Sequence, residues 1–395
     1  MKLKVALLGF GVGDDYFNQY CSRDPFPQVA ACKLEDRFAA AISVDGGEVV
    51  RISSAPVSTY PHNRKIYFPG LRFDGGKGFV TPLLNLPALK MLSRMLGSVM
   101  RIFQVGRKGV DALCVYSVHS PNLIAAYLCS RVLGIPFFVY IPDLPLLMGL
   151  GKKRSVVGEL LKRLDSRLID FLVSASSGIF AITKHMVEDS SVWRNKPYLV
   201  LEGIADDQEV SLSSGERLNV IFYAGGVNES YGVRHLVEGF LKSSLGHELW
   251  ICGRGDLEGY LKDISTVNPR VKYLGFLAPS EVAKIQSKSA LLVMARDPSE
   301  KYTRYSFPSK LLEYMVSGVP VLITRLDGIP EEYYDFSNII ESFSIDGICE
   351  AFEAFSRADQ VELFRKAACA REWVLRSKTC FSCGEKIIDF IRVNS

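Results

Sequence analysis

The residues with the clearest chemical potential lie in the stretch RYSFPSKLLEYMVSGVPVL, residues 304–322. Pro308 is expected in the first turn of a helix, which leaves the amides of Ser309 and Lys310 as unpaired donors that favour an anion. Glu313 follows one helical turn later, where a carboxylate can accept hydrogen bonds from two neighbouring hydroxyl groups, as on a ribose. The alternative is an ordinary solvated ion pair between Lys310 and Glu313 at i, i+3 spacing. The residues alone leave both interpretations open.

Helical geometry separates the polar and apolar residues of this stretch. At about 100° per residue, one face of the predicted helix comprises Leu311, Leu312, Met315 and Val316. The other face comprises Ser309, Lys310, Glu313, Tyr314 and Ser317. We therefore expect the polar face, with its glutamate, to be exposed rather than buried among the leucines.

Two glycine-rich turns precede this stretch, each directly after a predicted strand. The sequence AGG at 224–226 lets a ligand approach the backbone closely, because glycine has no side chain. The sequence GRGD at 253–256 offers amides and a guanidinium group that suit a diphosphate. Each turn alone is commonplace, but the two on consecutive strands together favour a phosphate-binding site.

The first half of the chain offers weaker candidates. Gly9, Gly11 and Gly13 form a glycine-rich turn after the first predicted strand, but the full dinucleotide fingerprint with its acidic partner is missing. We interpret it as a tight turn that lines the ligand site. His119 follows another predicted strand, where it either meets polar ligand atoms or serves as a capping or buried structural residue. Asp143, after the next strand, is a weaker candidate.

The hydrophobic pattern predicts the elements that hold these residues. Apolar runs of strand length alternate with helical patterns, which is typical of parallel sheets covered by helices on both faces. The first half has predicted strands at 3–9, 39–44, 112–118, 136–141 and 178–183. The second half has predicted strands at 218–226, 247–253, 271–276, 290–295 and 319–324. Helices are expected at 86–108, 121–134, 152–168 and from about 347 onward.

This alternation predicts an α/β protein with two doubly wound, Rossmann-like domains. The polar passage at 203–216 is interpreted as a linker. We place an N-terminal, acceptor-binding domain at 1–205, a C-terminal, donor-binding domain at 206–375, and a final helix at 376–395 that crosses back to the first domain. Ligands bind at the carboxyl ends of strands in such sheets, so we expect the site in a cleft that the two domains face.

Charge divides the chain into a basic and an acidic half. Residues 1–200 carry 25 Lys and Arg against 15 Asp and Glu, whereas the rest of the chain is acidic. The basic residues concentrate at 86–108 and 152–168, either as solvated faces of amphipathic helices or as a surface that rests on anionic lipid. No motif for nucleic-acid binding accompanies them, so we expect no nucleic-acid partner.

Cysteine usage and apolar runs indicate the compartment. Nine cysteines at irregular spacing suit reduced thiols, and the lone CxxC at 380–383 is interpreted as incidental. No apolar run approaches the ~18 residues of a transmembrane helix. We expect a cytoplasmic protein, peripheral at the inner face of the membrane if the basic surface binds lipid.

From about residue 218 to 340 the sequence resembles the donor-binding domain of the GT-B glycosyltransferases of family 4, or group 1. The matching segments are YAGG at 223–226, WICGRGDLEGYL at 250–261, VKYLGFLAPSEV at 271–282, ALLVMA at 290–295, SFPSKLLEYMVSGVPVL at 306–322 and DGIPE at 327–331. Their form is similar to that of bacterial enzymes that build capsule, O-antigen or exopolysaccharide. The first domain matches more loosely, through strand order and the segment around His119.

The resemblance implies a retaining transfer of a sugar from a UDP- or GDP-sugar to a hydroxyl group of a glycan or lipid-linked acceptor, without a metal or other cofactor. It implies that Glu313 binds the ribose and that Phe276 and Leu277 lie near the base. It assigns catalysis to His119, Lys310 and Glu313. The further donor-binding residues would be Gly225, Gly226, Gly253, Arg254, Gly255, Tyr305 and Ser309. On the acceptor side we expect Gly11, Gly13 and Asp143.

Two features depart from the family pattern. Tyr305 stands where the family commonly has the first of two glutamates. After the Gly-Gly turn, Gly226 and Tyr231 stand in place of an arginine and a lysine. The residues that can replace this lost positive charge are Lys310, Arg254 and Arg234.

These departures keep two other functions open. A catalytically weak homologue would act as a partner in a glycan-assembly complex. A nicotinamide-dependent oxidoreductase is suggested only by the glycine-rich start, and the incomplete fingerprint counts against it.

Overall fold

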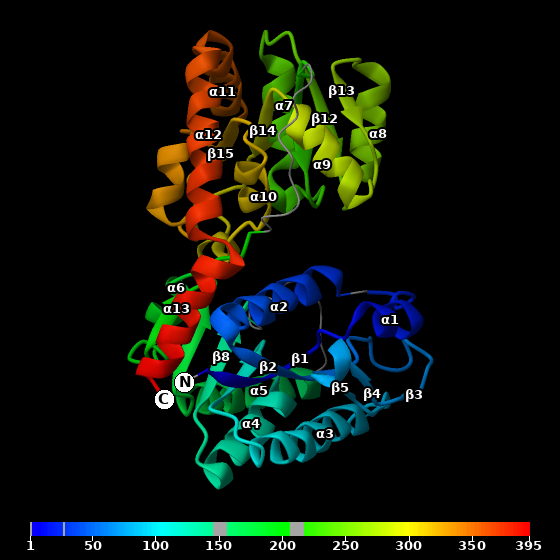
Figure 1. Cartoon of the computed structure of the whole chain (residues 1–395). Coiled ribbons are helices and arrows are strands. Elements are labelled where there is room, and N and C mark those ends of the chain that lie inside the picture. Colours follow the sequence, from blue (N-terminus) through cyan, green and yellow to red (C-terminus); the bar gives the residue numbers. More distant parts are fainter. Residues whose placement is uncertain (1, 27, 145–155, 206–216) are drawn as a thin grey trace. The chain divides into compact units, whose positions relative to one another are not determined.

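The computed structural model describes residues 2–26, 28–144, 156–205 and 217–395, which form two compact units (Figure 1). The first unit comprises Met1–Ile204 and Cys380–Ser395, and the second comprises Ala205–Thr379. The chain therefore returns to the first unit for its last helix. Most of the predicted linker, at 206–216, and the start of the second basic segment lie outside the described residues.

The first unit is built on an eight-stranded sheet with the order β10-β9-β8-β7-β1-β2-β5-β4. Its strands are β1 (Lys4–Gly9), β2 (Glu48–Ser54), β4 (Leu71–Phe73), β5 (Gly78–Thr81), β7 (Ala112–Tyr116), β8 (Phe137–Ile141), β9 (Gly178–Ala181) and β10 (Tyr198–Val200). All neighbours are parallel except β4 and β5. A separate antiparallel ribbon pairs β3 (Tyr67–Phe68) with β6 (Leu83–Leu84). Strands β7 and β8 are buried throughout, as continuous apolar runs in a covered parallel sheet should be.

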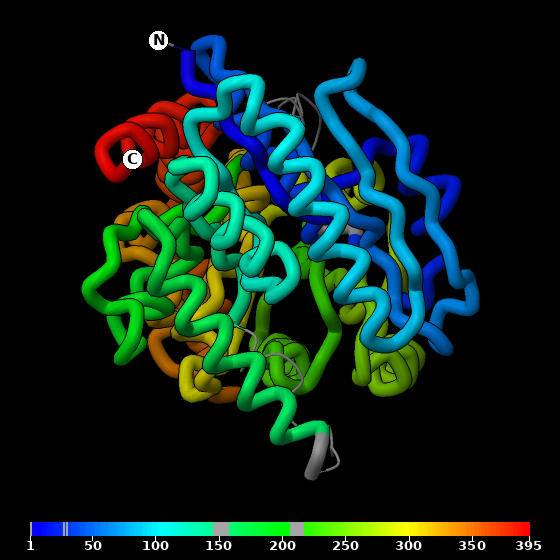
Figure 2. Tube along the Cα trace, turned by 90° about the horizontal axis from the view of Figure 1, so that it is seen from below, coloured from blue at the N-terminus to red at the C-terminus, as the bar shows by residue number. Residues whose placement is uncertain are grey.

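Helices cover both faces of this sheet. On one face, α3 (Leu89–Gly106), α4 (Ser120–Leu133) and α5 (Val156–Ser174) lie side by side (Figures 1 and 2). On the other face lie α2 (Val29–Ile42) and the last helix, α13 (Cys380–Val393). The ring of Phe390 packs against Phe138 and Phe180, with centroids 6.0 and 5.2 Å apart. This aromatic contact explains why the end of the chain belongs to the first unit.

The second unit is a six-stranded, fully parallel sheet with the order β13-β12-β11-β14-β15-β16. Its strands are β11 (Val220–Ala224), β12 (Glu248–Cys252), β13 (Val271–Tyr273), β14 (Leu291–Met294), β15 (Val321–Thr324) and β16 (Asn338–Ile340). Its helices are α7 (Val233–Lys242), α8 (Glu258–Val267), α9 (Pro279–Lys288), α10 (Lys310–Val316), α11 (Ile345–Arg357) and α12 (Gln360–Ser377). Apolar residues of α7, α8 and α11 form one buried cluster with the strands. This core fixes the strand ends on which the site depends.

The predicted α/β class with two doubly wound units is confirmed, but one predicted strand is wrong. The run at 39–44 forms the end of α2, and the strand follows at β2. Short apolar runs do not distinguish helix from strand, and this one begins with three alanines, the best helix formers. The final helix begins at Cys380, later than the predicted 376, because α12 continues to Ser377. No helix in the described part of the chain is both long and apolar enough to cross a bilayer.

Candidate functional site

Two glycine turns meet at the carboxyl edge of the second sheet, after the neighbouring strands β11 and β12. The Gly225 amide donates to the carbonyl oxygen of Cys252 at 3.0 Å, and the Val227 amide donates to that of Arg254 at 3.0 Å. Side chains complete the connection, because Asn228 Oδ1 accepts from the Asp256 amide at 3.2 Å. The two turns therefore form one rigid backbone surface.

Glycine is required where these turns touch. Gly253 has a φ of +143°, and a Cβ on it would lie 1.7 Å from the carbonyl oxygen of Gly225. A Cβ on Gly255 would lie 2.3 Å from the carbonyl oxygen of Val227. Within the described part of the chain, the amide of Gly226 donates to no protein acceptor. The surface thus offers a backbone donor that a ligand can approach.

The Lys310–Glu313 pair lies on α10, and the ion pair anticipated as the alternative interpretation is present. The two side chains are 37% and 39% exposed, so the pair is accessible to a ligand. Burial raises the pKa of the Cys252 thiol to about 11, and the nearby Lys310 ammonium opposes this rise, which places the ammonium near the end of β12. The backbone at Glu313 is fixed by Gln286, whose side-chain amide donates to the Glu313 backbone carbonyl oxygen at 2.8 Å.

The expectation that Tyr314 and Ser317 lie on the exposed face is wrong, since both are buried. The Tyr314 hydroxyl accepts from the Ala224 amide at 2.8 Å and donates to the Ala224 carbonyl oxygen at 3.3 Å. It thereby satisfies the backbone at the end of β11, and burial raises its pKa well above the usual range. Helical periodicity did not predict this burial, because a tyrosine ring can pack in the interior while its hydroxyl satisfies backbone groups at a strand end.

The other predicted donor-site residues lie in the segments that follow this sheet's strands, and Tyr305 is the last residue of a short 3-10 helix, Lys301–Tyr305. Phe276, after β13, is 67% exposed, and the Arg254 guanidinium lies 4.8 Å from its ring centroid. Leu277 and Tyr305 are partly buried. Ser309 is exposed directly before α10, which begins at Lys310, so the proline before it precedes the helix instead of opening it.

Sequence reasoning missed one cation, Arg296, which lies just past β14. Its guanidinium lies 4.9 Å from the ring centroid of Tyr231, and that ring would lie 2.8 Å from a Cβ on Gly226. Among the described residues it makes no ion pair. Arg234, predicted as a substitute cation, is instead occupied by both carboxylate oxygens of Glu229 at 2.9 and 3.1 Å. The sequence could have identified Arg296 as a candidate, because it directly follows the predicted strand at 290–295.

The glycine-rich turn of the first unit is filled by the protein's own side chains. The Phe10 amide donates to Glu35 Oε2 at 2.7 Å, and a Cβ on Gly9 would lie 2.2 Å from Glu35 Oε1. Burial raises the pKa of Glu35 to about 7, although the Phe10 amide and Arg51 oppose the rise. The place that a pyrophosphate takes in a dinucleotide fold is therefore occupied. This geometry counts against the oxidoreductase alternative.

Two of the predicted acceptor-side residues, Gly11 and Gly13, pack against neighbouring side chains of the first unit. Gly11 contacts Arg51, since a Cβ there would lie 1.9 Å from Nη2, whereas Gly13 contacts the ring of Phe73. Asp143 is exposed after β8. Gly11 and Gly13 therefore both serve packing, because Arg51 and Phe73 also contact each other, with 5.3 Å between the guanidinium carbon and the ring centroid.

His119 lies after β7 and is the N-cap residue of α4, but its side chain makes no capping hydrogen bond. Its ring is packed edge-on against Phe10, with centroids 5.1 Å apart. Its Nε2 lies 3.3 Å from Nη1 of Arg94. The capping role considered for this side chain is therefore wrong.

Helix α3 does not have the solvated basic face expected of an ordinary amphipathic helix. Lys90 and Arg94 are only 5% and 6% exposed, whereas Leu92, Leu96 and Met100 are about half exposed. The helix exposes several large apolar residues and buries two cations, although Ile102 and Val105 remain in the core. Sequence reasoning detected the amphipathic pattern but expected the basic residues to be solvated.

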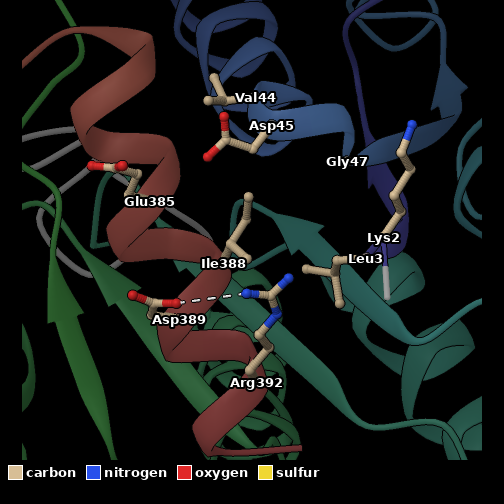
Figure 3. Close-up of a pocket in the computed structure, with 9 residues that line it drawn as sticks. All are labelled: Lys2, Leu3, Val44, Asp45, Gly47, Glu385, Ile388, Asp389 and Arg392. Carbon is tan, nitrogen blue, oxygen red and sulfur yellow. Dashed lines mark ion pairs between the residues drawn. The ribbon is translucent and has the colours of Figure 1, made fainter.

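A cavity of about 680 Å³ lies in the first unit, and Figure 3 shows the residues that line it. It is lined by Lys2, Leu3, Val44, Asp45, Gly47, Glu385, Ile388, Asp389 and Arg392. The lining carries both signs of charge and includes an ion pair of 3.8 Å within α13. The cavity lies at the amino end of β1, whereas ligands of such sheets bind at the carboxyl ends of the strands. We therefore do not assign it to the candidate site.

The class that this fold and this site define is that of the GT-B glycosyltransferases. Residues 218–353 match the family model of the glycosyl transferases group 1, so the second unit carries a domain similar to the glycosyltransferases of this group. The resemblance inferred from the sequence is thereby confirmed. No curated protein sequence matches the chain.

Solved structures of similar fold extend over nearly the whole chain. HepE from Anabaena, solved with UDP, is 12% identical with a TM-score of 0.65, covering 99% of this chain and 100% of its own. Sucrose-phosphate synthase from Thermosynechococcus elongatus is 13% identical with a TM-score of 0.64, covering 99% and 98%. WaaG, a glycosyltransferase involved in lipopolysaccharide biosynthesis, is 14% identical with a TM-score of 0.60, covering 98% and 99%. At these identities the likeness shows the fold alone.

Proposed function

We propose that this protein is a retaining glycosyltransferase that moves a hexose-type sugar from a UDP- or GDP-sugar to a hydroxyl group of a glycan or lipid-linked acceptor, in surface-polysaccharide synthesis. The observation that carries the proposal is the accessible Lys310–Glu313 pair next to two interlocked glycine turns, within a group 1 domain. Two neighbours in fold support it, since HepE was solved with UDP-glucose and WaaG is involved in lipopolysaccharide biosynthesis.

The donor would be held by its ribose and its diphosphate. Glu313 accepts hydrogen bonds from the ribose hydroxyl groups, and Phe276 and Leu277 border the base. Lys310 exchanges its carboxylate partner for a phosphate oxygen, at small cost because a half-exposed ion pair contributes only ~0–1 kcal/mol. The amide of Gly226 supplies a neutral donor to the same phosphates.

Fixed positive charge would assist the transfer. As the bond between the sugar and the diphosphate lengthens, negative charge collects on the leaving phosphate, and Lys310, Arg254 and Arg296 stabilise it. The acceptor oxygen bonds to the anomeric carbon on the face that the diphosphate leaves, and its proton passes to the diphosphate. We propose that no metal is needed, because these cations fill its electrostatic role and the sequence contains no Asp-x-Asp. Activity that persists in excess EDTA would support this, and activity restored only by a divalent metal would contradict it.

The acceptor would be reached at the membrane surface. Helices α3, α4 and α5 share one layer and expose apolar side chains at Leu89, Met91, Leu92, Leu96, Met100, Leu128, Val132, Leu160, Leu161, Leu164, Leu168 and Phe171. Exposed cations, including Arg163 and Arg167, accompany them on α5. An apolar surface with interspersed cations suits the headgroup region of an anionic bilayer. We therefore propose a peripheral protein at the inner face of the membrane.

Calorimetric titration with UDP, GDP and their sugars tests the donor assignment. We expect one of the two nucleotides to bind, and Glu313→Ala to weaken it about tenfold by removing the ribose acceptor, a charged hydrogen bond worth about 1.5 kcal/mol. Glu362→Ala is the matched control, because Glu362 pairs with Arg365 at the same i, i+3 spacing on α12. If neither nucleotide binds, or if both variants behave alike, the donor site is wrong. Binding without any sugar transfer would favour the catalytically weak partner suggested by Tyr305.

A further inference from the structure

The first unit buries two cations that have no ion-pair partner among the described residues. Lys90 and Arg94 lie one turn apart on α3 and are 5% and 6% exposed. No carboxylate in the described residues lies within ion-pair distance of either side chain. Burying charge without compensation is costly, so such groups normally have an opposite charge beside them. The pair therefore lacks a component that a ligand can supply.

Neutral acceptors hold both side chains in place. Lys90 Nζ donates to the Val57 carbonyl oxygen at 2.6 Å and to Thr59 Oγ1 at 3.0 Å. Arg94 donates to Ser54 Oγ at 3.0 Å and to the Ala55 carbonyl oxygen at 2.7 Å. These contacts orient the cations without adding negative charge. Burial, followed by the charge of Arg94, lowers the pKa of Lys90 to about 8, and the Asp24 carboxylate opposes the shift. The oxygens of Asp24 accept from Ser58 and Asn63 and from neither cation.

His119 adds an unpaired donor beside them. The Arg94 guanidinium can only donate, so the contact of 3.3 Å makes His119 Nε2 the acceptor and leaves the ring proton on Nδ1. This Nδ1 is buried and has no hydrogen-bond partner in the described part of the chain. Burial and then Arg94 lower the pKa of His119 to about 3, so the ring remains neutral and keeps this tautomer at physiological pH. An unpaired buried donor costs about 1–3 kcal/mol, which an acceptor from a ligand would recover.

These groups gather at the edge of the sheet where ligands bind. Ser54 ends β2, Phe10 follows β1, and His119 follows β7, so all three mark carboxyl ends of strands. The Phe10 ring lies 5.1 Å from the Arg94 guanidinium and 5.1 Å from the centroid of the His119 ring. The amino end of α4 begins at the same histidine, and its dipole adds positive potential. The guanidinium, the ammonium, the Nδ1 proton of His119 and the amino end of α4 all favour negative charge at this edge.

We propose that Lys90, Arg94 and His119 form an oxyanion subsite in the first unit, which binds a carboxylate or phosphate group of a substrate. The inference rests on the proposed function and narrows its acceptor to an acidic glycan, such as one with a uronic acid or a phosphate next to the reacting hydroxyl. The second unit has its own cations for the donor diphosphate, which is why we assign this subsite to the acceptor. The donor diphosphate is the other source of the same chemistry, and the experiment separates the two. If Lys90 and Arg94 had only a structural role, they would hold residues 54–59 in place and would bind no anion.

The test follows the side-chain nitrogens of His119 by NMR in the full chain labelled with 15N-histidine, the signal being assigned with His119→Gln. UDP is added to saturation first, and then glucuronate or inorganic phosphate is titrated. We expect the His119 signal, protonated at Nδ1 in the free protein, to shift on the second addition. Arg94→Met should weaken the titrated anion at least about tenfold, as expected for loss of a charged hydrogen bond. Lys90→Met, which keeps the Arg94–His119 contact, should weaken it by a smaller factor.

A matched variant and the order of additions serve as controls. Arg107→Met removes an exposed cation from the end of the same helix and should leave the titration unchanged. A shift caused by UDP alone, with none from the later anions, would assign the subsite to the donor diphosphate and overturn the acidic acceptor. The subsite itself would be overturned if the His119 signal did not shift in any titration. It would also be overturned if Arg94→Met, Lys90→Met and Arg107→Met bound the titrated anion with equal affinity. UDP binding measured by calorimetry in the same samples reports separately on the proposed donor site.

Discussion

The two units each have a glycine-rich turn after the first strand of a parallel sheet, and they use it in opposite ways. In the first unit the turn surrounds the buried carboxylate of Glu35, which accepts from the Phe10 amide at 2.7 Å. In the second unit the turn at 225–226 packs against another backbone turn and leaves the Gly226 amide without an acceptor among the described residues. The same local sequence feature encloses a carboxylate of the protein in one unit and leaves a backbone donor without a protein acceptor in the other, as the proposed diphosphate site would need.

The difference lies in where the acids are placed. Glu35 reaches the first turn from α2 and is fully buried. Near the second turn the acids remain at the periphery, where Glu258 accepts from the Gly255 amide at 3.3 Å and Asp256 accepts from the Glu229 amide at 2.9 Å. A glycine-rich turn therefore offers amide donors, and the surrounding residues decide whether an acidic side chain of the protein occupies them.

The largest effect is expected from Gly253→Ala, which attacks the contact between the two turns of the second unit. The new Cβ would lie 1.7 Å from the Gly225 carbonyl oxygen at a φ of +143°, so the backbone must move. We expect a loss of about 3 kcal/mol in the free energy of unfolding, from overpacking plus backbone strain. Nucleotide affinity should fall at least about tenfold, or ~1.4 kcal/mol. Urea unfolding and calorimetry measure the two quantities.

Two alanine controls separate strain from ligand binding. Gly9→Ala crowds Glu35 in the first unit, with a Cβ 2.2 Å from its carboxylate, and should lower stability without changing nucleotide affinity. Gly259→Ala on α8 meets no atom within 4 Å and should raise stability by about 0.5–1 kcal/mol. A Gly253→Ala protein that binds nucleotide normally would remove the second turn from the site.

The internal anion of the first unit predicts a dependence of stability on pH. Glu35 has a raised pKa of about 7 in the folded protein, against an ordinary value of 4.5. The unfolded chain therefore loses this proton at lower pH than the folded chain does, and the free energy of unfolding should fall as the pH rises between these values. Glu35→Gln cannot titrate and should remove a decrease on the order of 2 kcal/mol between pH 5 and pH 8.

Urea unfolding of both proteins at several pH values checks this expectation. Glu48→Gln is the control, because Glu48 is exposed at the start of β2 and pairs with Lys4 at 3.2 Å. Parallel pH curves for wild type and Glu35→Gln would mean that Arg51 keeps the carboxylate ionised throughout. The filled turn would then hold an ion pair instead of a carboxyl group that gains and loses its proton.

Most of the second unit was predictable from the sequence, because its strands are continuous apolar runs bounded by glycine turns. All five strands predicted in that half are present, and β16 is additional. The helix with Lys310 and Glu313 was also placed correctly, and its periodicity put both side chains within reach of solvent. Local pattern suffices where burial, turn chemistry and helical period agree.

The remaining features depend on contacts between distant segments. Glu35, on α2, accepts from the Phe10 amide of a turn that lies 25 residues earlier in the sequence, and its own sequence neighbours do not indicate that it is buried. Lys90 and Arg94 are exceptions to the tendency of charged residues to face water. They are buried because backbone and side-chain oxygens of residues 54–59, from another part of the chain, accept their hydrogen bonds. Tyr314 likewise is buried by the end of β11. Such tertiary hydrogen bonds override periodicity, and a single sequence does not show them.

The smallest effect is expected from Arg296→Met, which tests whether the open turn of the second unit uses a neighbouring cation. The guanidinium lies over Tyr231, whose ring adjoins Gly226, so its loss should weaken UDP or GDP about tenfold, or ~1.4 kcal/mol, and reduce the salt dependence of binding. Arg325→Met is the matched control, since Arg325 follows the next strand and lies 4.7 Å from the ring centroid of Tyr334 but pairs with Glu331. Equal affinities for the two variants would leave Lys310 and Arg254 as the cations of the site. A loss confined to Arg296→Met would show that a cation beyond the predicted three supports the open turn, as Arg51 supports the filled one.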